Sequence, residues 1–316
     1  MLQLTDLASV PSEVVPSVVT IGNFDGVHLG HGALLDEVVR QARGRSIHAI
    51  AVTFDPHPLR VLHPDRAPDQ LCDLPTRLER IADHGVDVTL VLPFTLELAA
   101  MSPEEFVHAV FVQALGAQAV VVGRDTKFGA KNSGDVDTLR ELGQKYGFEV
   151  TVLQDVGDDG RFSSTSVRAH LHEGDIPAAA HVLGRLPEVR GTVVRGHMRG
   201  RELGFPTANL SPESTGLVPA DGVYGGWLVR DNLPEDHPDH RMPAAISVGT
   251  NPTFDDVPER TVEAYVLDRD DLDLYDEHVR VEFVQRLRGN VRFDSIEALI
   301  EQMTRDVDIC RDLLQP

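Results

Sequence analysis

Two hydrophobic patterns follow one another along this chain, and together they limit the folds that it can adopt. Up to about Gln154, short apolar runs alternate with segments whose apolar residues recur at helical spacing. Apolar strands that alternate with helices pair into a parallel sheet covered on both faces, so this part predicts an α/β domain. After Leu186 and Pro187 helical periodicity largely disappears, and short strands separated by Gly, Pro and Asp predict a small antiparallel barrel. With 316 residues the chain can build two cores, and we expect domains at residues 1–185 and 186–316.

The expected elements follow from these patterns. The first domain has strands at 18–21, 49–54, 88–92, 119–122 and 149–153, helices at 33–41, 76–82, 103–115 and 136–146, and a short closing helix at 174–185. The barrel has strands at 189–194, 222–229, 244–248, 261–267 and 279–285, and an amphipathic helix at 296–314 that packs on it.

A glycine-rich loop joins the first expected strand to the first helix, with the sequence Gly22-Asn23-Phe24-Asp25-Gly26-Val27-His28-Leu29-Gly30-His31. Its glycines let the backbone turn sharply, and the helix that follows directs N–H groups and the positive end of its dipole into the loop. The histidines at 28 and 31 add imidazole donors, so a bound phosphate is the favoured interpretation. Two such histidines alone are as typical of a metal half-site or a helix-capping device as of a phosphate loop, and His57 and His63 could complete a zinc set. Zinc ligands do not need the Gly-Asn-Phe-Asp-Gly lead-in, which favours the phosphate.

Three other polar segments follow expected strands, at 55–58, 123–129 and 163–168. The carboxyl ends of parallel strands meet at one edge of a sheet, so these segments and the glycine-rich loop should converge there. Their glycines, hydroxyls, His, Lys and Arg suit a nucleoside triphosphate. Taken alone, the hydroxyls of Ser163, Ser164 and Thr165 are most often a helix cap.

Composition excludes some partners. A net charge of −21 argues against coating nucleic acid or an anionic membrane, because such binding needs a basic face. The cysteines, Cys72 and Cys310, have no metal-type spacing and indicate a reduced, cytoplasmic protein. No apolar run approaches the ~20 residues that span a bilayer. The sequence leaves the oligomeric state open, a homo-oligomer included.

In the second domain the chemistry concentrates in residues 195–209. Its glycines, Gly196 and Gly200 among them, can wrap phosphates, with Arg199 and Arg201 as cations. Pro206 stiffens the chain, so Thr207 and Asn209, two residues apart on an extended segment, should point to the same side. A hydroxyl and an amide oxygen are hard ligands suited to Mg²⁺, which also takes oxygens from nucleotide phosphates.

The first domain resembles the nucleotidylyltransferase superfamily, a Rossmann-like fold in which an HxGH-type loop and a late Ser-Thr-x-x-Arg segment grip ATP. More narrowly, residues 22–28, Thr53-Phe54-Asp55-Pro56-His57-Pro58 and the Gly-Asp pair after Phe128-Gly129 resemble the FMN adenylyltransferase module of prokaryotic bifunctional FAD synthetases. The resemblance implies that the FMN phosphate attacks the α-phosphorus of ATP and pyrophosphate leaves. It implies that His28 and His31 donate to the ATP phosphates and that Arg168 neutralises the pyrophosphate. It also places Gly22, Asn23, Phe24, Gly30, Asp125, Ser164 and Thr165 at ATP, and Phe128 and Pro58 beside the flavin.

The second domain resembles riboflavin kinases through Gly204-Phe205-Pro206-Thr207-Ala208-Asn209, followed in the family's order by 222–224, 248–254 and 262–268. The resemblance implies that Glu263 is the general base, which takes the proton of the riboflavin 5′-hydroxyl as the γ-phosphoryl group is transferred. Without it, the ordinary interpretation of Glu263 is an outward carboxylate on a strand. It further implies that Gly196, Arg199, Gly200, Arg201 and Pro206 bind ATP, and that Thr207 and Asn209 hold Mg²⁺.

The resemblances together imply an enzyme that makes FMN from riboflavin and then FAD from FMN. ATP is the co-substrate of both steps, Mg²⁺ is required, and no tightly bound prosthetic group is implied. One alternative is a nucleotidylyltransferase for another phosphorylated substrate with an accessory barrel, which leaves residues 204–209 and Glu263 unexplained. Another is a flavin- or nucleotide-sensing module without turnover, against which the retained candidate catalytic residues speak.

Overall fold

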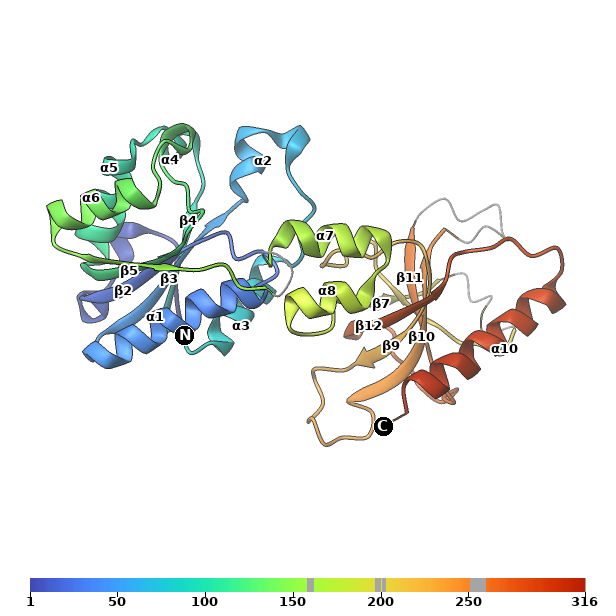
Figure 1. The fold of residues 1–316 in the computed structure, drawn as a ribbon. Helices are drawn as coiled ribbons and strands as arrows, with labels where there is room; N and C mark the ends of the chain where they lie inside the picture. Colours follow the sequence, from blue (N-terminus) through green and yellow to red (C-terminus); the bar gives the residue numbers. More distant parts are fainter. Residues whose placement is uncertain (158–161, 197–199, 201–202, 251–259, 316) are drawn as a thin grey trace. The chain divides into compact units, whose positions relative to one another are not determined.

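The computed structural model describes residues 1–157, 162–196, 200, 203–250 and 260–315. The chain folds into two compact units, Met1–Ser164 and Thr165–Pro316, whose elements are labelled in Figure 1. The expected boundary after residue 185 stays a prediction about where one function ends and the next begins. Within the described ranges, none of the helices has the length and apolar character needed to cross a membrane.

The first unit contains a six-stranded sheet in the order β1-β4-β3-β2-β5-β6, with every neighbouring pair parallel. From β2 the strands that follow in sequence add on one side, and from β5 they add on the other. The strand order therefore reverses between β2 and β5, and this is where such sheets bind ligands. The strands are β1 (Leu2–Leu4), β2 (Ser17–Ile21), β3 (His48–Asp55), β4 (Val88–Pro93), β5 (Ala117–Gly123) and β6 (Glu149–Leu153).

Helices flank this sheet, and among them α2 and α4 were not expected. They are α1 (Leu29–Arg45), α2 (Pro58–Leu62), α3 (Leu74–Asp83), α4 (Leu96–Ala100), α5 (Pro103–Phe106) and α6 (Val136–Tyr146), with short 3-10 turns at Leu7–Ser9, Ser12–Val14, Pro64–Arg66 and Ala130–Asn132. The helix expected at 103–115 is α-helical only in α5, where Ser102 and Glu105 form a capping box, and then widens into a π-helix, Val107–Ala114. The apolar spacing shows which side chains face the core. It does not determine whether the backbone hydrogen bonds follow the α-helical or the π-helical pattern.

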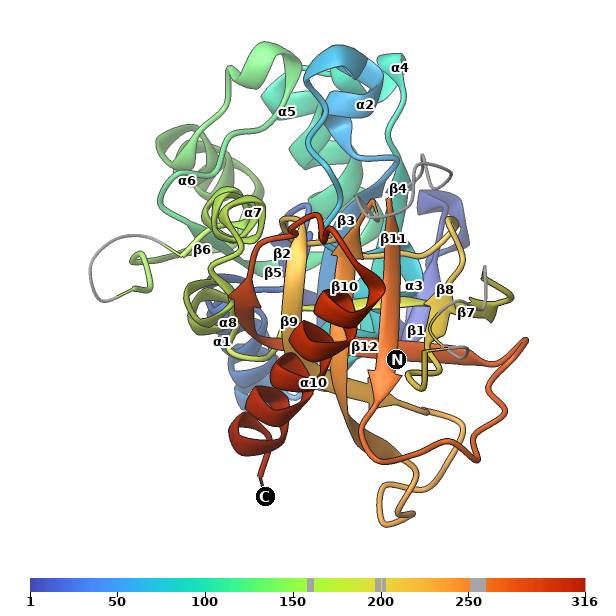
Figure 2. The same cartoon turned by 90° about the vertical axis from the view of Figure 1, so that its right-hand side faces the viewer.

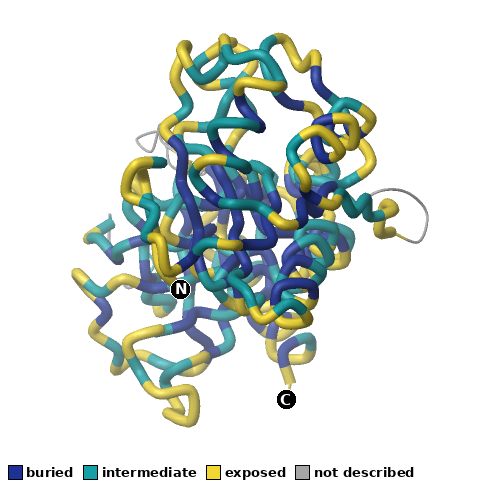
Figure 3. Tube along the Cα trace, turned by 90° about the vertical axis from the view of Figure 1, so that its left-hand side faces the viewer, coloured by how far each residue is buried: buried dark blue, intermediate teal, exposed yellow. Residues whose placement is uncertain are grey.

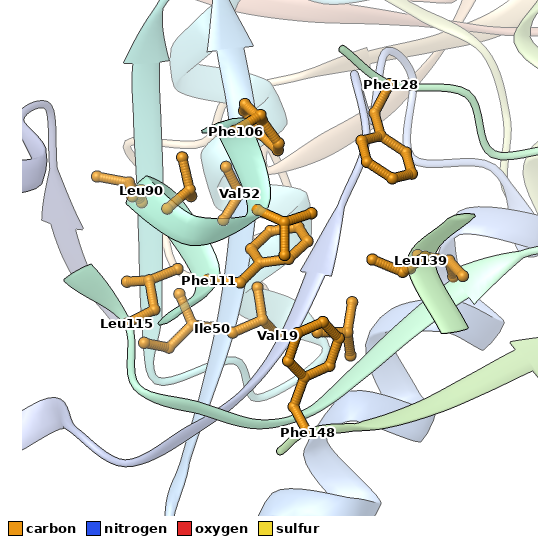
Figure 4. Packing of buried hydrophobic residues seen from close by; sticks show 14 of the residues in the cluster. Val19, Ile50, Val52, Leu90, Phe106, Phe111, Leu115, Phe128, Leu139 and Phe148 are labelled. Atoms are coloured by element: carbon orange, nitrogen blue, oxygen red, sulfur yellow. The ribbon is translucent and has the colours of Figure 1, made fainter. Parts of the chain in front are cut away.

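The core of the first unit lies on both faces of the sheet, because alternate residues of each strand point to opposite sides. On one face, bulky residues of the strands pack against Phe106, Phe111 and Leu139, as Figure 4 shows. On the other face, alanines and valines of the strands pack against α1. The central strands are dark blue in Figure 3, as expected for strands buried from both sides.

The second unit is a closed barrel in the order β10-β11-β8-β7-β12-β9, with two short helices before it. All six neighbouring pairs are antiparallel, which confirms the predicted fold class. The three-residue strand β8 was not expected. The elements are α7 (Ser164–Glu173), α8 (Ile176–Leu183), β7 (Glu188–Val194), β8 (Ala208–Leu210), β9 (Gly222–Val229), β10 (Arg241–Gly249), β11 (Thr261–Val266), β12 (His278–Arg288) and α10 (Ile296–Leu313).

Helix α10 lies along the barrel, as Figure 2 shows, and packs on it through a stripe that contains Val307 and Cys310. Its partners in this cluster include Trp227 and Tyr265. Burial raises the pKa of the Cys310 thiol to about 12, so this thiol stays protonated and acts as a small apolar side chain. The tail helix was predicted at 296–314, and the structure confirms it within one residue.

Candidate active sites

The glycine-rich loop is held in place by Asp25, whose side chain is buried. The carboxylate accepts the backbone N–H of Leu71 at 3.1 Å and that of Cys72 at 3.3 Å. The backbone carbonyl of Asp25 accepts the hydroxyl of Ser164 at 2.8 Å. Asp25 thus joins three segments that are far apart in sequence. The sequence alone did not distinguish this role, because an Asp between glycines is equally typical of a turn.

The start of helix α1 lies in the same loop, and His28 caps it. Its Nδ1 accepts the backbone N–H of Gly30 at 3.1 Å and that of His31 at 3.3 Å. The neutral ring must therefore carry its proton on Nε2, which is the donor that His28 can offer. The rings of His28 and His31 stack, with centroids 3.7 Å apart and planes at 22°.

Two residues of this loop have an unusual backbone. Phe24 has φ 49° and Val27 has φ 36°, a left-handed conformation that costs energy for residues with a side chain. Phe24 is fully buried, its ring edge faces His31, and a Cβ on Gly22 would come within 3.1 Å of the ring. The Phe24 side chain therefore supports the loop from beneath. Contact with a nucleotide by Gly22, Asn23, Phe24 or Gly30 stays a prediction.

The segment after β3 meets the glycine-rich loop through His57. Its Nδ1 accepts the backbone N–H of Leu59 at 3.1 Å and caps α2, which begins at Pro58. Its Nε2 lies 3.3 Å from the side-chain amide of Asn23. Because Nδ1 accepts, Nε2 carries the ring proton, and this proton is satisfied when Asn23 turns its amide oxygen toward the ring. The convergence of these two loops agrees with the prediction from strand order.

The loop after β5 brings Phe128 into the core rather than to the surface. Phe128 is buried, packs near Phe106, and pairs with Gly134 through two backbone hydrogen bonds of 3.1 and 2.9 Å. Asp135 caps α6, and the backbone N–H of Thr138 and then the ammonium of Lys127 hold its pKa below the usual range. Asp125 is exposed. Flavin contact by Phe128 or Pro58, and nucleotide contact by Asp125, stay predictions.

The late hydroxyl segment begins helix α7. The hydroxyl of Ser164 donates to the backbone carbonyl of Asp25, so it links the start of α7 to the glycine-rich loop. Thr165 is exposed and Arg168 is half-buried, and both belong to the second unit. The predicted role of Arg168 at the leaving pyrophosphate stays a prediction.

In the second unit, strands β8 and β11 bring three candidate residues together. Glu263 lies opposite Asn209 in the strand register. One carboxylate oxygen of Glu263 accepts the hydroxyl of Thr207 at 3.2 Å, and the other accepts the hydroxyl of Thr261 at 3.3 Å. The Asn209 amide nitrogen donates to the Thr207 hydroxyl oxygen at 3.1 Å, which confirms that these two side chains point to one side.

The glycines before this cluster allow close approach of the chain. A Cβ on Gly196 would lie 2.7 Å from the amide carbon and oxygen of Asn209. The carbonyl of Gly200 accepts the backbone N–H of Phe205 at 2.7 Å and closes a tight turn before Pro206. The predicted cations Arg199 and Arg201 lie outside the described residues.

A cavity of about 90 Å³ adjoins Thr207 and Asn209. Its walls include Gly196 and Pro206 together with apolar side chains from the segment after β11, namely Leu272, Leu274 and Tyr275. Arg269 and Asp270 also line it, so its walls are polar and apolar in similar measure. From the sequence, no role is assigned to Leu272, Leu274 or Tyr275.

The donor set at Thr207 and Asn209 fits Mg²⁺ better than zinc. It offers a hydroxyl and an amide, with the Glu263 carboxylate in the same hydrogen-bond cluster. Such hard oxygen atoms are the ligands of Mg²⁺. In the portion of the chain that the structure describes, no group of three or more His, Cys, Asp or Glu side chains is placed to hold a metal. His57, the proposed third zinc ligand, instead caps α2.

Comparisons with known families cover almost the whole chain. The family model described as FAD synthetase matches residues 10–166, and the model described as riboflavin kinase matches residues 183–314. A crystal structure described as a macrolide-efflux protein from Streptococcus pneumoniae has the same fold, with a TM-score of 0.86 at 30% identity over 98% of each chain.

Curated relatives match over similar lengths. The bifunctional riboflavin kinase/FMN adenylyltransferase of Escherichia coli (strain K12) is 35% identical over 95% of this chain and 93% of its own. The protein of that name from Pseudomonas fluorescens is 37% identical over 95% of this chain and 93% of its own. With both family models in the expected order, this chain belongs to the bifunctional riboflavin kinase/FMN adenylyltransferase family.

Proposed function

We propose that the chain makes FAD in two ATP-dependent steps, one in each unit. In the second unit riboflavin and ATP give FMN and ADP. In the first unit FMN and ATP give FAD and pyrophosphate. The family membership supports this assignment, and the separation of the two candidate sites into two compact units fits it.

In the kinase step Glu263 is the general base. The hydroxyls of Thr207 and Thr261 hold the two carboxylate oxygens, so the carboxylate has a fixed direction. Thr207 and Asn209 would hold Mg²⁺, which when bound neutralises charge on the phosphates of ATP. The cavity beside them receives the organic part of a substrate. Arg199 and Arg201 are proposed to bind phosphates.

In the adenylyl step the glycine-rich loop binds the phosphates of ATP. Transfer to the FMN phosphate needs no covalent nucleophile, so positioning and stabilisation of charge carry it. The Nε2 donor of His28, the neighbouring His31 and the start of α1 all belong to one loop, whose geometry Asp25 fixes. Arg168, Ser164 and Thr165 are proposed to act on the leaving pyrophosphate.

One observation carries the proposal above others, namely the cluster of Glu263, Thr207 and Asn209 on adjacent strands. A nucleotidylyltransferase for another substrate has no use for it. Glu263 lies in the half-buried, outward-facing row of β11, and there its carboxylate accepts two hydroxyl hydrogen bonds. The cytoplasmic location, the oligomeric state and the absence of a prosthetic group remain predictions.

The direct test incubates the purified chain with riboflavin, ATP and Mg²⁺ and resolves riboflavin, FMN and FAD by chromatography over time. We expect FMN first and FAD later. Absence of FMN would remove the kinase assignment, and FMN without FAD would remove the adenylyltransferase assignment. Binding of ATP and flavin with no product at all would favour the sensing module.

Single substitutions separate the two sites. Glu263→Gln keeps the shape of the side chain but removes the base, so riboflavin phosphorylation should fall by about 100-fold or more while FMN adenylylation stays within about twofold. His31→Ala should have the opposite pattern. Loss of both activities in either folded variant would contradict two independent sites.

A further inference from the structure

A buried cation lies beneath the edge of the sheet where the glycine-rich loop begins. It is Arg77, on helix α3, with a side chain that is only 2% exposed. A buried charge costs several kcal/mol unless it is paired and hydrogen-bonded. The contacts of Arg77 therefore show how the protein compensates for its burial. No feature of the sequence singles it out, because a basic residue in an amphipathic helix usually lies on the solvated face.

One nitrogen of Arg77 bridges the two loops that follow β2 and β3. Its Nη1 donates to the backbone carbonyl of Asn23 at 3.1 Å and to that of Phe54 at 2.9 Å. The hydroxyl of Thr53 donates to the same Asn23 carbonyl at 3.1 Å and lies 3.4 Å from Nη1. The guanidinium therefore fixes the end of β3 against the first turn of the glycine-rich loop.

The charge of Arg77 is only partly compensated by a carboxylate. The nearest ion-pair contact joins Nη2 to Asp55 at 3.9 Å, and the Asp55 side chain is 43% exposed. The close contacts of Nη1 are instead neutral carbonyl oxygens. A buried positive charge that lacks a close counter-ion favours anions nearby, and this one contacts the Asn23 carbonyl within the candidate phosphate loop.

We propose that Arg77 is a positioning residue for adenylyl transfer. Nη1 of its guanidinium, held in the plane of the group, bonds the carbonyl ends of the Asn23 and Phe54 peptides, and this sets the turn from which the His28 cap and the start of α1 follow. It does not touch the reacting atoms. The proposal rests on the proposed function of the first unit, namely that this loop binds the phosphates of ATP.

The experiment compares Arg77→Met, Arg77→Lys and the control Arg40→Met in the full-length chain. Arg40 is also a helical arginine, but it is 71% exposed and bonded only to Glu37 in its own helix. FMN adenylylation is measured with kcat and KM for ATP separated, and riboflavin phosphorylation by the same sample serves as an internal standard for the active concentration.

Arg77→Met should lower kcat/KM for FMN adenylylation by about 100-fold, the loss expected when a reacting group is misplaced by about 1 Å. Arg40→Met should leave it within about twofold, and riboflavin phosphorylation should stay unchanged in all three variants. Arg77→Lys keeps the charge but loses the planar fork. The KM for ATP should therefore stay close to the wild-type value, while kcat falls by about tenfold.

The outcomes separate the proposal from the function on which it rests. If the wild-type chain fails to convert FMN and ATP into FAD, the proposed function is wrong, whatever Arg77 does. If the wild type is active and Arg77→Lys has the wild-type kcat, positioning by the fork is refuted. Should Arg77→Met lose the folded first unit, judged by far-UV circular dichroism against the intact kinase activity, the Arg77→Lys split of kcat and KM still decides.

Discussion

At the scale of single residues, helix capping by His28 and its proposed contact with a phosphate use different nitrogens of the ring. Nδ1 accepts two backbone N–H groups at the start of α1, so in the neutral ring Nε2 carries the proton. One side chain thus caps the start of a helix, and the phosphate contact proposed for it stays a prediction. The same division holds for His57, whose Nδ1 caps α2 while Nε2 meets Asn23.

Substitution of His28 should separate these jobs. Asparagine is a strong N-cap residue, so His28→Asn should keep the free energy of unfolding of the first unit within about 0.5 kcal/mol. It lacks the Nε2 donor, so FMN adenylylation should fall by about 100-fold. His28→Ala should lose the same activity and about 1 kcal/mol of stability as well. Urea unfolding followed by circular dichroism, with adenylylation assays, measures both, and wild-type activity in His28→Asn would restrict this residue to capping.

At the scale of elements, helix α10 is joined to the barrel by ion pairs as well as by its apolar stripe, and one of these pairs is buried on the side of the helix residue. The buried carboxylate of Asp306 accepts Nη2 of Arg288 at 2.7 Å and the side-chain amide of Gln302 at 2.9 Å. Arg286, on the same strand, donates to the carbonyl of Asp221 at 2.5 Å. These contacts give both arginines a structural role that the sequence did not reveal.

Asp306→Asn should weaken the attachment of α10. It leaves Arg288 without its carboxylate partner, so we expect a loss of about 1–3 kcal/mol in the free energy of unfolding of the second unit. The single tryptophan, Trp227, packs in the cluster beneath α10, and its fluorescence reports this transition in urea. The control Arg305→Gln breaks an exposed pair with Glu301 and should change stability by less than about 0.5 kcal/mol. Equal effects of both substitutions would contradict the assigned role.

The elements also show how far sequence reasoning reaches. Long periodic segments were predicted well, and β6 and α6 match their predicted ranges residue for residue. The three-residue strands β1 and β8 were missed, since three residues show no alternation. The structural roles of the buried Arg77 and of Asp25, whose carboxylate holds the glycine-rich loop, were also missed. Their roles come from contacts with residues distant in sequence, and local pattern carries no record of such contacts.

At the scale of the whole molecule, each unit contains its own core, and the glycine-rich loop and the Glu263 cluster belong to different units. The residues assigned to phosphoryl transfer all lie after Thr165, and the glycine-rich loop lies before Ser164. FMN is the product of one step and the substrate of the other, and no covalent bond to the chain is needed to carry it.

Mixing two variants, each of which lacks one of the two activities, should therefore restore the complete conversion of riboflavin into FAD. Glu263→Gln and His31→Ala each lack one step, but together they supply both, and FMN released by one chain is used by the other. We expect FAD to appear after a lag during which free FMN accumulates, measured by chromatography. If each variant keeps its remaining activity and the mixture still makes no FAD from riboflavin, FMN does not leave the chain that makes it.

The open sheet of the first unit and the closed barrel of the second have different edges, and this has a practical consequence for handling the protein. Taken by itself, the sheet of the first unit has two outer strands, β1 and β6, whereas the strands of the second unit close on one another. An outer strand presents backbone groups to which a strand from another molecule can add, and a closed barrel presents none. The brevity of β1, only three residues, limits such growth on one side. In concentrated samples we therefore expect strand-to-strand association to start on the sheet of the first unit rather than on the barrel.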